Sequence, residues 1–580
     1  MSAISLSFVS NQWSPTGASS IAETSTADRS QLANATSLAI ASSSNPAAIS
    51  FNASALPALA PSATGDTRFL HVTQYPSSLQ TVNVTYEALA NLQTRNGKMQ
   101  VWEQAPTTAV DQIIGRNASA TSQSARFAGL GSALLEQVAS TGASYRQTIV
   151  NVAAAYSPDK IQGKAADAQW AIRSSPSASA ALTIKTQSGA SVRISIADQR
   201  LPVSTGAGMT VQIDVEGDLT PQEQQALQSL AKGFDEAMEG LTREPPLVNL
   251  DGLMKFDSKL LTRVELKSEV YGLNDQGERA MVLGTRFTAS ADSREIELKT
   301  LKGTATVKTD LRQSAIWGSA EQKARAVQQY LGRVDKAAER GNGNQELVDL
   351  FKSSFAALHG GYGDSDRDSD RASGLTRVRP ADITSDADAF SEEDHSLLTG
   401  MADFRASILT NRRAINPRHT NEIDIFDYKL EQSTQISGGS AANRAITQTQ
   451  TSDLSAGFHR SLRSRREPEL SSDSATQNYY YTQVEDHSST RMELAYEKDK
   501  PVRALLTQAA SQFLRTTKVE FNKVVETMEE PLQQQSQHKD LLPLLEQLLR
   551  REEADDLSAE EKQRTLREWN AMVLGGPGAA

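Results

Sequence analysis

Alternating apolar and polar positions are clearest in residues 181–358, which we predict to form an α+β core domain. Apolar side chains occupy every second position of several short runs, as in strands with one buried face. The runs lie at 182–184, 192–196, 211–215, 264–270, 281–287, 296–298 and 305–307. Helical patterns follow the strands twice, an order typical of an antiparallel sheet and not of a doubly wound parallel one.

The helices of this core domain begin with recognisable caps. Thr220 is followed by Pro221 and by Glu223, the spacing of a capping box with proline in the first turn. Ser319 and Gln322 repeat the cap before a second helix, which we expect to end at Gly341. A third helix is predicted over 347–358 from its apolar spacing.

Upstream, we predict a helical segment over residues 86–157. Apolar residues recur at helical spacing over 127–138 and again over 145–156, with a break at Thr141–Gly142, so we expect a helical hairpin. Residues 157–180, which contain two prolines and many serines and alanines, are predicted to be a linker.

Downstream, residues 360–390 are predicted to be a polar linker, and 391–500 a helix followed by polar antiparallel strands. The helix is expected to run from Ser391 to Ile408, and the strands to form a thinly apolar meander over 422–497.

Residues 501–574 are predicted to be C-terminal helices. Apolar residues over 502–528 alternate spacings of three and four, which indicates one long amphipathic helix ended by Pro531. Two shorter helices are expected at 541–549 and 566–573, the second after a capping box from Ser558 to Glu561. An ordinary helical bundle is favoured over a coiled coil, because so few heptads do not specify one.

Residues 1–80 are rich in serine, alanine and threonine, with fourteen serines in the first fifty positions. Such a segment has too few apolar side chains to offset its ordering entropy, so we predict a disordered tail. The chain shows neither an apolar run of about 20 residues nor the pattern of a cleaved signal peptide. We therefore expect a protein with no membrane span, either cytoplasmic or secreted by a signal-peptide-independent route.

The net charge and the absence of cysteine exclude several kinds of partner and chemical site. The net charge of −11 argues against nucleic acid as a partner, because phosphate binding draws on clustered Lys and Arg. The basic patch at 460–466 (RSLRSRR) is interpreted as a solvated loop, with a phosphate or anionic-lipid contact as the alternative. With no cysteine, disulfides, thiol nucleophiles and Cys-ligated metals are excluded.

No motif along the chain assigns a catalytic residue, a cofactor or a metal. GDSDRDSDR (363–371) has the glycine and glutamate of an EF-hand loop in neither register. Four histidines fall within 390–490 without metal-site spacing, so only the fold could assemble them into a cluster; they are His395, His419, His459 and His487. The adjacent Asp394 and His395 suit an acid–base pair, but Asp394 also suits a helix start.

Five segments carry a family resemblance: GLGSALLEQ (129–137), VEGDLTPQEQQAL (215–227), GLTREPPLVNLDGL (240–253), WGSAEQKARAVQQYLGRVDKAAERGNGN (317–344) and LLTGMADFRASI (397–408). Together they resemble an uncharacterised family of bacterial proteins whose members often carry the label "lactate dehydrogenase". The resemblance spans roughly residues 100–436 and implies no active-site residues. The residues themselves do not support that label, because the third glycine of a dinucleotide fingerprint is replaced by Leu134.

The N-terminus also resembles a type III secretion signal, because it is serine-rich, has Ile4 and has no acidic residue before Glu23. Three hypotheses follow. The first is a non-enzymatic binding or assembly protein with protein partners. The second is a type III-secreted effector with an unrecognised activity in the C-terminal half. The third is a cytosolic enzyme.

Overall fold

The computed structural model describes residues 92–575, except 96–97, 154–157, 201–206, 275, 361, 363–389, 441 and 465. The chain divides into residues 1–80 and 81–580, and every described residue belongs to the second unit. The predicted tail at 1–80 lies outside the described residues, as does nearly all of the predicted 360–390 linker.

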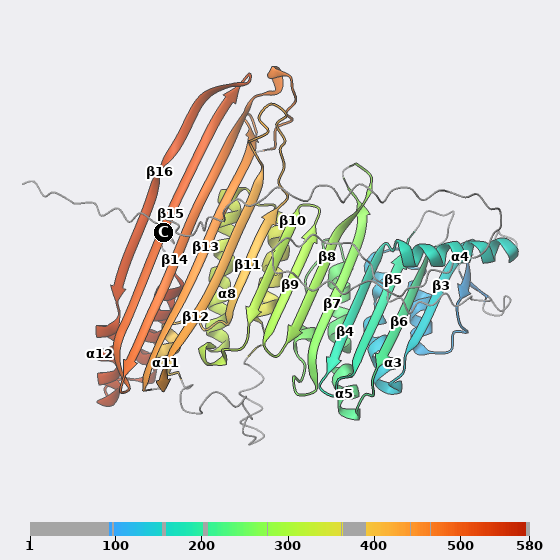
Figure 1. Ribbon diagram of the computed structural model, residues 1–580, viewed down its shortest axis with the longest axis horizontal. Helices are drawn as coiled ribbons and strands as arrows, with labels where there is room; N and C mark the ends of the chain where they lie inside the picture. Colours follow the sequence, from blue (N-terminus) through green and yellow to red (C-terminus); the bar gives the residue numbers. More distant parts are fainter. Residues whose placement is uncertain are drawn as a thin grey trace, which may run out of the picture. The chain divides into compact units, whose positions relative to one another are not determined.

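The described strands form one antiparallel sheet of sixteen strands (Figure 1). Its order follows the sequence except that β3 pairs with β6 and β4 pairs with β7. The strands are β1 (Leu92–Arg95), β2 (Lys98–Trp102), β3 (Tyr145–Ala153), β4 (Ala178–Thr186), β5 (Ser191–Gln199), β6 (Ala207–Glu216), β7 (Leu261–Leu273), β8 (Arg279–Ser290), β9 (Ser293–Thr300), β10 (Gly303–Asp310), β11 (Asp403–Thr410), β12 (Ile425–Ser440), β13 (Asn443–Ser461), β14 (Tyr479–Glu497), β15 (Lys500–Glu520) and β16 (Lys523–Asp540).

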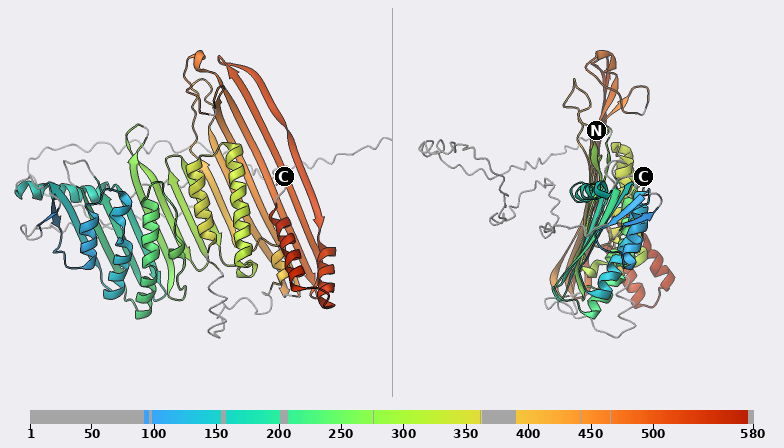
Figure 2. Two further views of the ribbon diagram at one scale, coloured as in Figure 1. Left: turned by 180° about the vertical axis from the view of Figure 1, so that it is seen from behind. Right: turned by 90° about the vertical axis from the view of Figure 1, so that its right-hand side faces the viewer.

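Most helices cover one face of this sheet, and α4 lies on the other (Figure 2). The helices are α1 (Ala109–Asn117), α2 (Gln123–Phe127), α3 (Leu130–Thr141), α4 (Pro158–Ser174), α5 (Pro221–Ser229), α6 (Ala231–Thr242), α7 (Asp251–Met254), α8 (Ala320–Gly341), α9 (Gln345–His359), α11 (Glu392–Ser396), α12 (Leu542–Glu553) and α13 (Ala559–Leu574), with short 3-10 turns η1 (Ser314–Ile316) and η2 (Ser474–Thr476). No helix among the described residues is long and apolar enough to cross a membrane.

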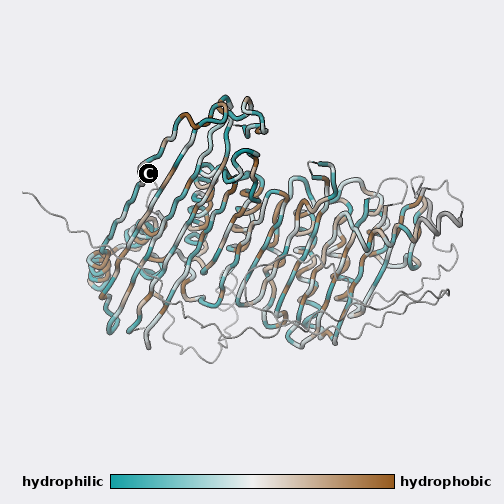
Figure 3. Tube along the Cα trace, turned by 45° about the horizontal axis from the view of Figure 1, so that its top comes forward, coloured by the Kyte–Doolittle hydropathy of each residue, from teal (hydrophilic) through white to brown (hydrophobic). Residues whose placement is uncertain are grey.

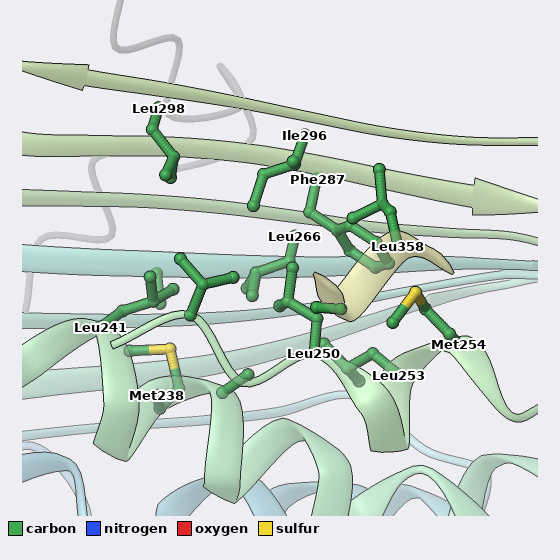
Figure 4. Packing of buried hydrophobic residues seen from close by; sticks show 14 of the residues in the cluster. Met238, Leu241, Leu250, Leu253, Met254, Leu266, Phe287, Ile296, Leu298 and Leu358 are labelled. Atoms are coloured by element: carbon green, nitrogen blue, oxygen red, sulfur yellow. The ribbon is translucent and has the colours of Figure 1, made fainter. Parts of the chain in front are cut away.

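The predicted strands of 181–358 are confirmed. Leu266, Phe287 and Leu298 project from successive strands into a core closed by side chains such as Met238 and Leu358 of the helices (Figure 4). Both predicted helix starts in this region are also confirmed, because Thr220 accepts from Glu223 N in a complete capping box and Ser319 accepts from Gln322 N. The antiparallel α+β class is therefore as predicted.

The predicted helical hairpin is wrong in its second half. Residues Tyr145–Ala153 form β3, and the expected 157–180 linker contains the helix α4. Ile149 faces the main helical layer, whereas Val150 and Val152 face α4 on the other side. A strand buried on both faces loses its polar–apolar alternation, so apolar residues also fall at helical spacing.

The helix predicted from Ser391 to Ile408 is also wrong. The helix α11 ends at Ser396, and Asp403–Thr410 forms strand β11. Phe404 and Ile408 are four residues apart and lie on the same face of β11, a spacing that a helix and a strand share.

The long helix predicted over 502–528 is wrong as well. These residues form most of β15, a two-residue turn and the start of β16. The two shorter helices are confirmed as α12 and α13, and Ser558 and Glu561 make the expected capping box.

The strands β12–β16, which we call the wing, contain 16 to 21 residues each, whereas β4–β11, which we call the body, contain 8 to 13. Hydrophilic and intermediate positions dominate the long strands (Figure 3). The wing ends in an edge strand, β16, whose described side chains are all exposed.

A candidate binding surface on the long strands

Two loops and a turn meet at one end of the wing, which we call the tip end. It comprises the loops 411–424 and 462–478 and the turn at Phe521–Asn522. Pairing places Ser461, Tyr479, Val519 and Val524 side by side across β13 to β16, so these segments begin at the same level of the sheet.

Buried His459 fastens the first loop to the sheet. Its Nδ1 lies 2.6 Å from Asp424 Oδ1 and its Nε2 3.1 Å from Glu422 Oε2. Ionised carboxylates only accept hydrogen bonds, so contacts from both ring nitrogens favour the doubly protonated, cationic form of the ring. The Tyr479 hydroxyl also donates to Glu422, at 2.8 Å, and receives a hydrogen bond from Asn416 at 2.9 Å.

The pKa values of this cluster favour the ion pair. Burial lowers the pKa of His459, but hydrogen bonds to Asp424 and Glu422 outweigh it, so the pKa lies above its usual value. Burial raises the pKa of Glu422, and hydrogen bonds from His459 and Tyr479 more than reverse this, so that pKa is lowered. The His459 side chain is fully buried. Its contacts to Glu422 and Asp424 attach the loop 411–424 to β13, and we call these three residues the His459 clasp.

The fold separates the four histidines singled out in the sequence into different roles. His419 bonds to Asn522 at 3.0 Å, so it joins the same loop to the hairpin turn. His487 pairs with Asp453 on the exposed sheet face. His395 lies far away in α11, where Asp394 completes the capping box of Ser391 and pairs with Arg444 at 2.5 Å.

No group of three or more His, Asp or Glu side chains in the described part of the chain is placed to hold a metal. The acidic segment 363–371 lies outside that part. The glycine-rich stretch at 129–134 begins α3, where Gly131 packs against α6 and its N–H donates to Asp235 at 2.9 Å. Gly131 is therefore explained by the close packing of α3 against α6.

A cleft of about 200 Å³ lies between α8 and the wing. Arg333, Lys336 and Arg340 line its helical wall. Arg340 is already paired with Asp486 at 2.5 Å, and Arg333 donates to the Leu574 carbonyl at 2.6 Å. Two of the three cations therefore serve to join α8 to its neighbours.

The face of the wing away from α8 is polar and its charges are largely matched across strands. Arg405 of the adjoining strand β11 pairs with Glu431 of β12 at 2.9 Å, and Arg515 pairs with Glu529 at 3.3 Å. Such exposed pairs hold strands in register but each contributes less than about 1 kcal/mol.

The turn between β15 and β16 differs from this polar face. Four large apolar side chains within eight residues are exposed: Phe521 (65%), Val524 (61%), Val525 (55%) and Met528 (46%). Phe521 and Asn522 have φ values of 46° and 62°, which define a type I′ turn. Bulky residues rarely adopt positive φ, so phenylalanine here is conformationally unfavourable.

The preceding hairpin provides a contrast. Its turn, between β14 and β15, has the same backbone with φ values of 49° and 62°, but its residues are Lys498 and Asp499. The hairpin geometry therefore does not require an apolar residue. The sequence predictions missed the Phe521 turn because they placed it inside a helix; the dipeptide Phe521–Asn522 carries only asparagine as a turn signal.

The neighbouring edge strand β16 carries features that limit indiscriminate strand pairing. Pro531 and Leu532 lie where the register with β15 shifts, and a second shift leaves Val525 without a partner on β15. Proline, bulges and charged residues are the usual protection of an exposed edge. The exposed apolar side chains at the turn are thus an exception on an edge strand that is otherwise protected from pairing.

Comparisons with known proteins give no relative for this chain. No protein-family model matches it. No curated protein is similar to it. No solved structure matches its fold.

Proposed function

We propose that this is a non-enzymatic binding or assembly protein that makes contact through the β15–β16 turn. One observation carries the proposal: three exposed apolar side chains, Phe521, Val524 and Val525, lie on or next to a turn whose backbone disfavours phenylalanine. Contiguous exposed apolar residues on an otherwise polar surface are typical of interaction sites. The proposal is that this turn makes a contact, and a protein is the partner that the sequence analysis expects.

The turn is also well supported for such a role. Phe521 N donates to Asn478 Oδ1 at 3.1 Å, and Asn522 N donates to the Gln477 carbonyl at 3.2 Å. Together with the contact of His419 to Asn522 and the His459 clasp, these bonds hold the turn in one position. Preorganisation of this kind lowers the entropic cost of binding.

Site-specific photo-crosslinking tests the contact. A photoreactive phenylalanine analogue is placed at position 521 of the full chain and, as the matched control, at position 498 in the other type I′ turn. Cells producing each form are irradiated. We expect adducts at position 521 and none at 498; equal labelling at the two positions would remove the basis of the proposal.

Export is a separate proposal that rests on the composition of residues 1–80. We propose that this segment directs type III secretion. A reporter fused to residues 1–80 should leave a type III-competent strain and remain inside a mutant that lacks the secretion apparatus. Retention in both strains would contradict it.

A further inference from the structure

The composition of the tip end indicates what the apolar turn contacts. Arg463 and Arg466 are exposed in the loop that follows β13. The Ser461 amide bonds to the Arg466 carbonyl at 3.0 Å, which folds this loop back and keeps both arginines near the end of β13. Within the part of the chain that the structure describes, neither guanidinium has an ion-pair partner.

The arginines and the apolar residues lie at the same level of the sheet. Ser461 and Val519 belong to one lateral row, two strands apart. Neighbouring strands are separated by about 4.8 Å, so the ends of β13 and β15 lie about 10 Å apart. Arg463 lies two residues beyond Ser461, and Phe521 lies two residues beyond Val519. The cationic and apolar side chains are therefore at the same end of the sheet and near one another.

Charges at the tip end contrast with those of the whole chain, whose net charge is −11. Glu467 of the tip end bonds to Arg413, and Glu520, which immediately precedes the turn, pairs with Lys518 at 2.7 Å. Glu422 and Asp424 are both in contact with buried His459. Glu469, Asp473 and Glu526 remain as acidic neighbours.

An apolar anchor beside basic side chains is the combination that binds an anionic lipid surface. Apolar groups enter the boundary between headgroups and acyl chains, and Lys or Arg contact lipid phosphates. Insertion also requires that the inserted backbone be hydrogen-bonded. The Phe521 and Asn522 amides already donate to residues 477–478, which removes part of that cost.

We propose that the β15–β16 turn inserts Phe521, Val524 and Val525 into the interface of an anionic bilayer while Arg463 and Arg466 bind lipid phosphates. This rests on the proposed contact role of the turn and names its partner. Met528 lies further along β16, roughly 20 Å from the turn at about 3.3 Å per residue, and is outside the depth of such an anchor.

Vesicle co-sedimentation of the full chain tests this. The probes are phosphatidylcholine vesicles with and without about 30% phosphatidylglycerol. We expect binding to the anionic vesicles to be at least about tenfold stronger and to weaken at about 0.5 M salt, where charges are screened. Absence of binding to either vesicle, or equal binding to both, would overturn the proposal.

Phe521→Asn is the decisive variant because asparagine suits the turn, so lost binding does not reflect lost folding. We expect it to weaken binding at least about tenfold. Arg463→Gln with Arg466→Gln should weaken binding to the anionic vesicles only. Lys498→Asn, which makes a similar change in the opposite turn, should leave binding unchanged. Phe521→Asn that binds like the wild-type chain would contradict the inference.

The crosslinking experiment separates failure of this inference from failure of the proposed function. Protein adducts at position 521 without lipid adducts would leave the turn as a contact site and reject the bilayer. No adduct of either kind would reject both. Lipid adducts at 521 that disappear in the Arg463→Gln, Arg466→Gln background support the bilayer.

Discussion

The body and the wing use different means to hold strands of one continuous sheet. In the body, strands alternate between buried and half-exposed positions, and Leu266, Phe287 and Ile296 pack directly against helices. In the wing, long strands carry polar residues on both faces, and buried glutamines form a network beneath α8. Apolar burial dominates the first region, whereas hydrogen bonds and paired charges contribute a larger share of the second.

The glutamine network shows how the wing differs. Gln432 is buried, accepts from the Thr399 hydroxyl at 2.8 Å and donates to the Met401 carbonyl at 3.1 Å. Gln448 accepts from Thr399 N at 2.9 Å, and Tyr330 of α8 donates to Gln450 at 3.1 Å. Because the donors and acceptors of buried amides need hydrogen-bond partners, this network fixes the position of α8 over the wing.

The largest expected effect belongs to the body. Phe287→Ala removes a fully buried ring from the main core, and we expect a loss of about 3–5 kcal/mol in the free energy of unfolding. Denaturant unfolding followed by fluorescence measures it. Phe513→Ala, in the half-exposed part of the wing, is the matched control and should cost much less. Similar losses at both positions would contradict the comparison.

The His459 clasp is the next test, and its effect depends on pH. The pKa of His459 is raised in the folded state, so its contribution is fully present below about pH 6.5 and is lost as pH rises through the folded pKa. We expect His459→Gln to cost about 2–3 kcal/mol at pH 6 and less at higher pH. Thermal unfolding of both proteins across this range provides the measurement. A difference that grows with pH would show that the ring is not cationic.

His359 of α9 is expected to affect stability with the opposite pH dependence, which provides a contrast with His459. Burial and the nearby Arg294 lower its pKa to about 3. Its unfolded form therefore binds a proton below about pH 6.5 while the folded form does not, so this residue lowers stability as pH falls toward 3.

A smaller loss is expected from the buried glutamines. Gln432→Ala leaves the Thr399 hydroxyl and the Met401 carbonyl without this partner, and we expect a cost of about 2 kcal/mol. Hydrogen exchange should show the loosening confined to β11–β13 and α8. Gln435→Ala, at an exposed position of the same strand, is the control. Uniform loosening of the whole sheet would argue against a separate polar network in the wing.

Phe521→Asn should change stability in the other direction. Positive φ costs a bulky L-residue about 1–2 kcal/mol, and asparagine tolerates it better, so we expect a gain of up to about 1 kcal/mol. Differential scanning calorimetry would detect it as a higher Tm. A lower Tm would mean that the exposed ring contributes to folding.

The smallest effect concerns the exposed face. A double-mutant cycle on Arg405 and Glu431, whose side chains are 2.9 Å apart, should give a coupling of less than about 1 kcal/mol that falls with salt. A coupling of several kcal/mol would show that surface charge, and not burial, holds β11 to β12.

The sequence by itself determined the body from β4 to β10, because these strands alternate apolar and polar positions and the helices beside them begin with local caps. The periods of apolar residues and the bonds of Thr220 to Glu223 depend on neighbouring residues, so they can be read from the chain. The same holds for α12 and α13.

The polar antiparallel strands predicted over 422–497 are confirmed as β12, β13 and β14. Only the tertiary structure decided β3, β11, β15 and β16. Val150 is apolar because α4 covers it from the far side, and Leu506 and Phe513 fall on opposite faces of β15. In both places, apolar residues on two faces produced a helical spacing in a strand. The clasp joins His459 to residues 35 and 37 positions away. The loop that carries Arg463 and Arg466 lies near the Phe521 turn because β13, β14 and β15 are paired. Such contacts depend on long-range strand register, which local periodicity does not encode.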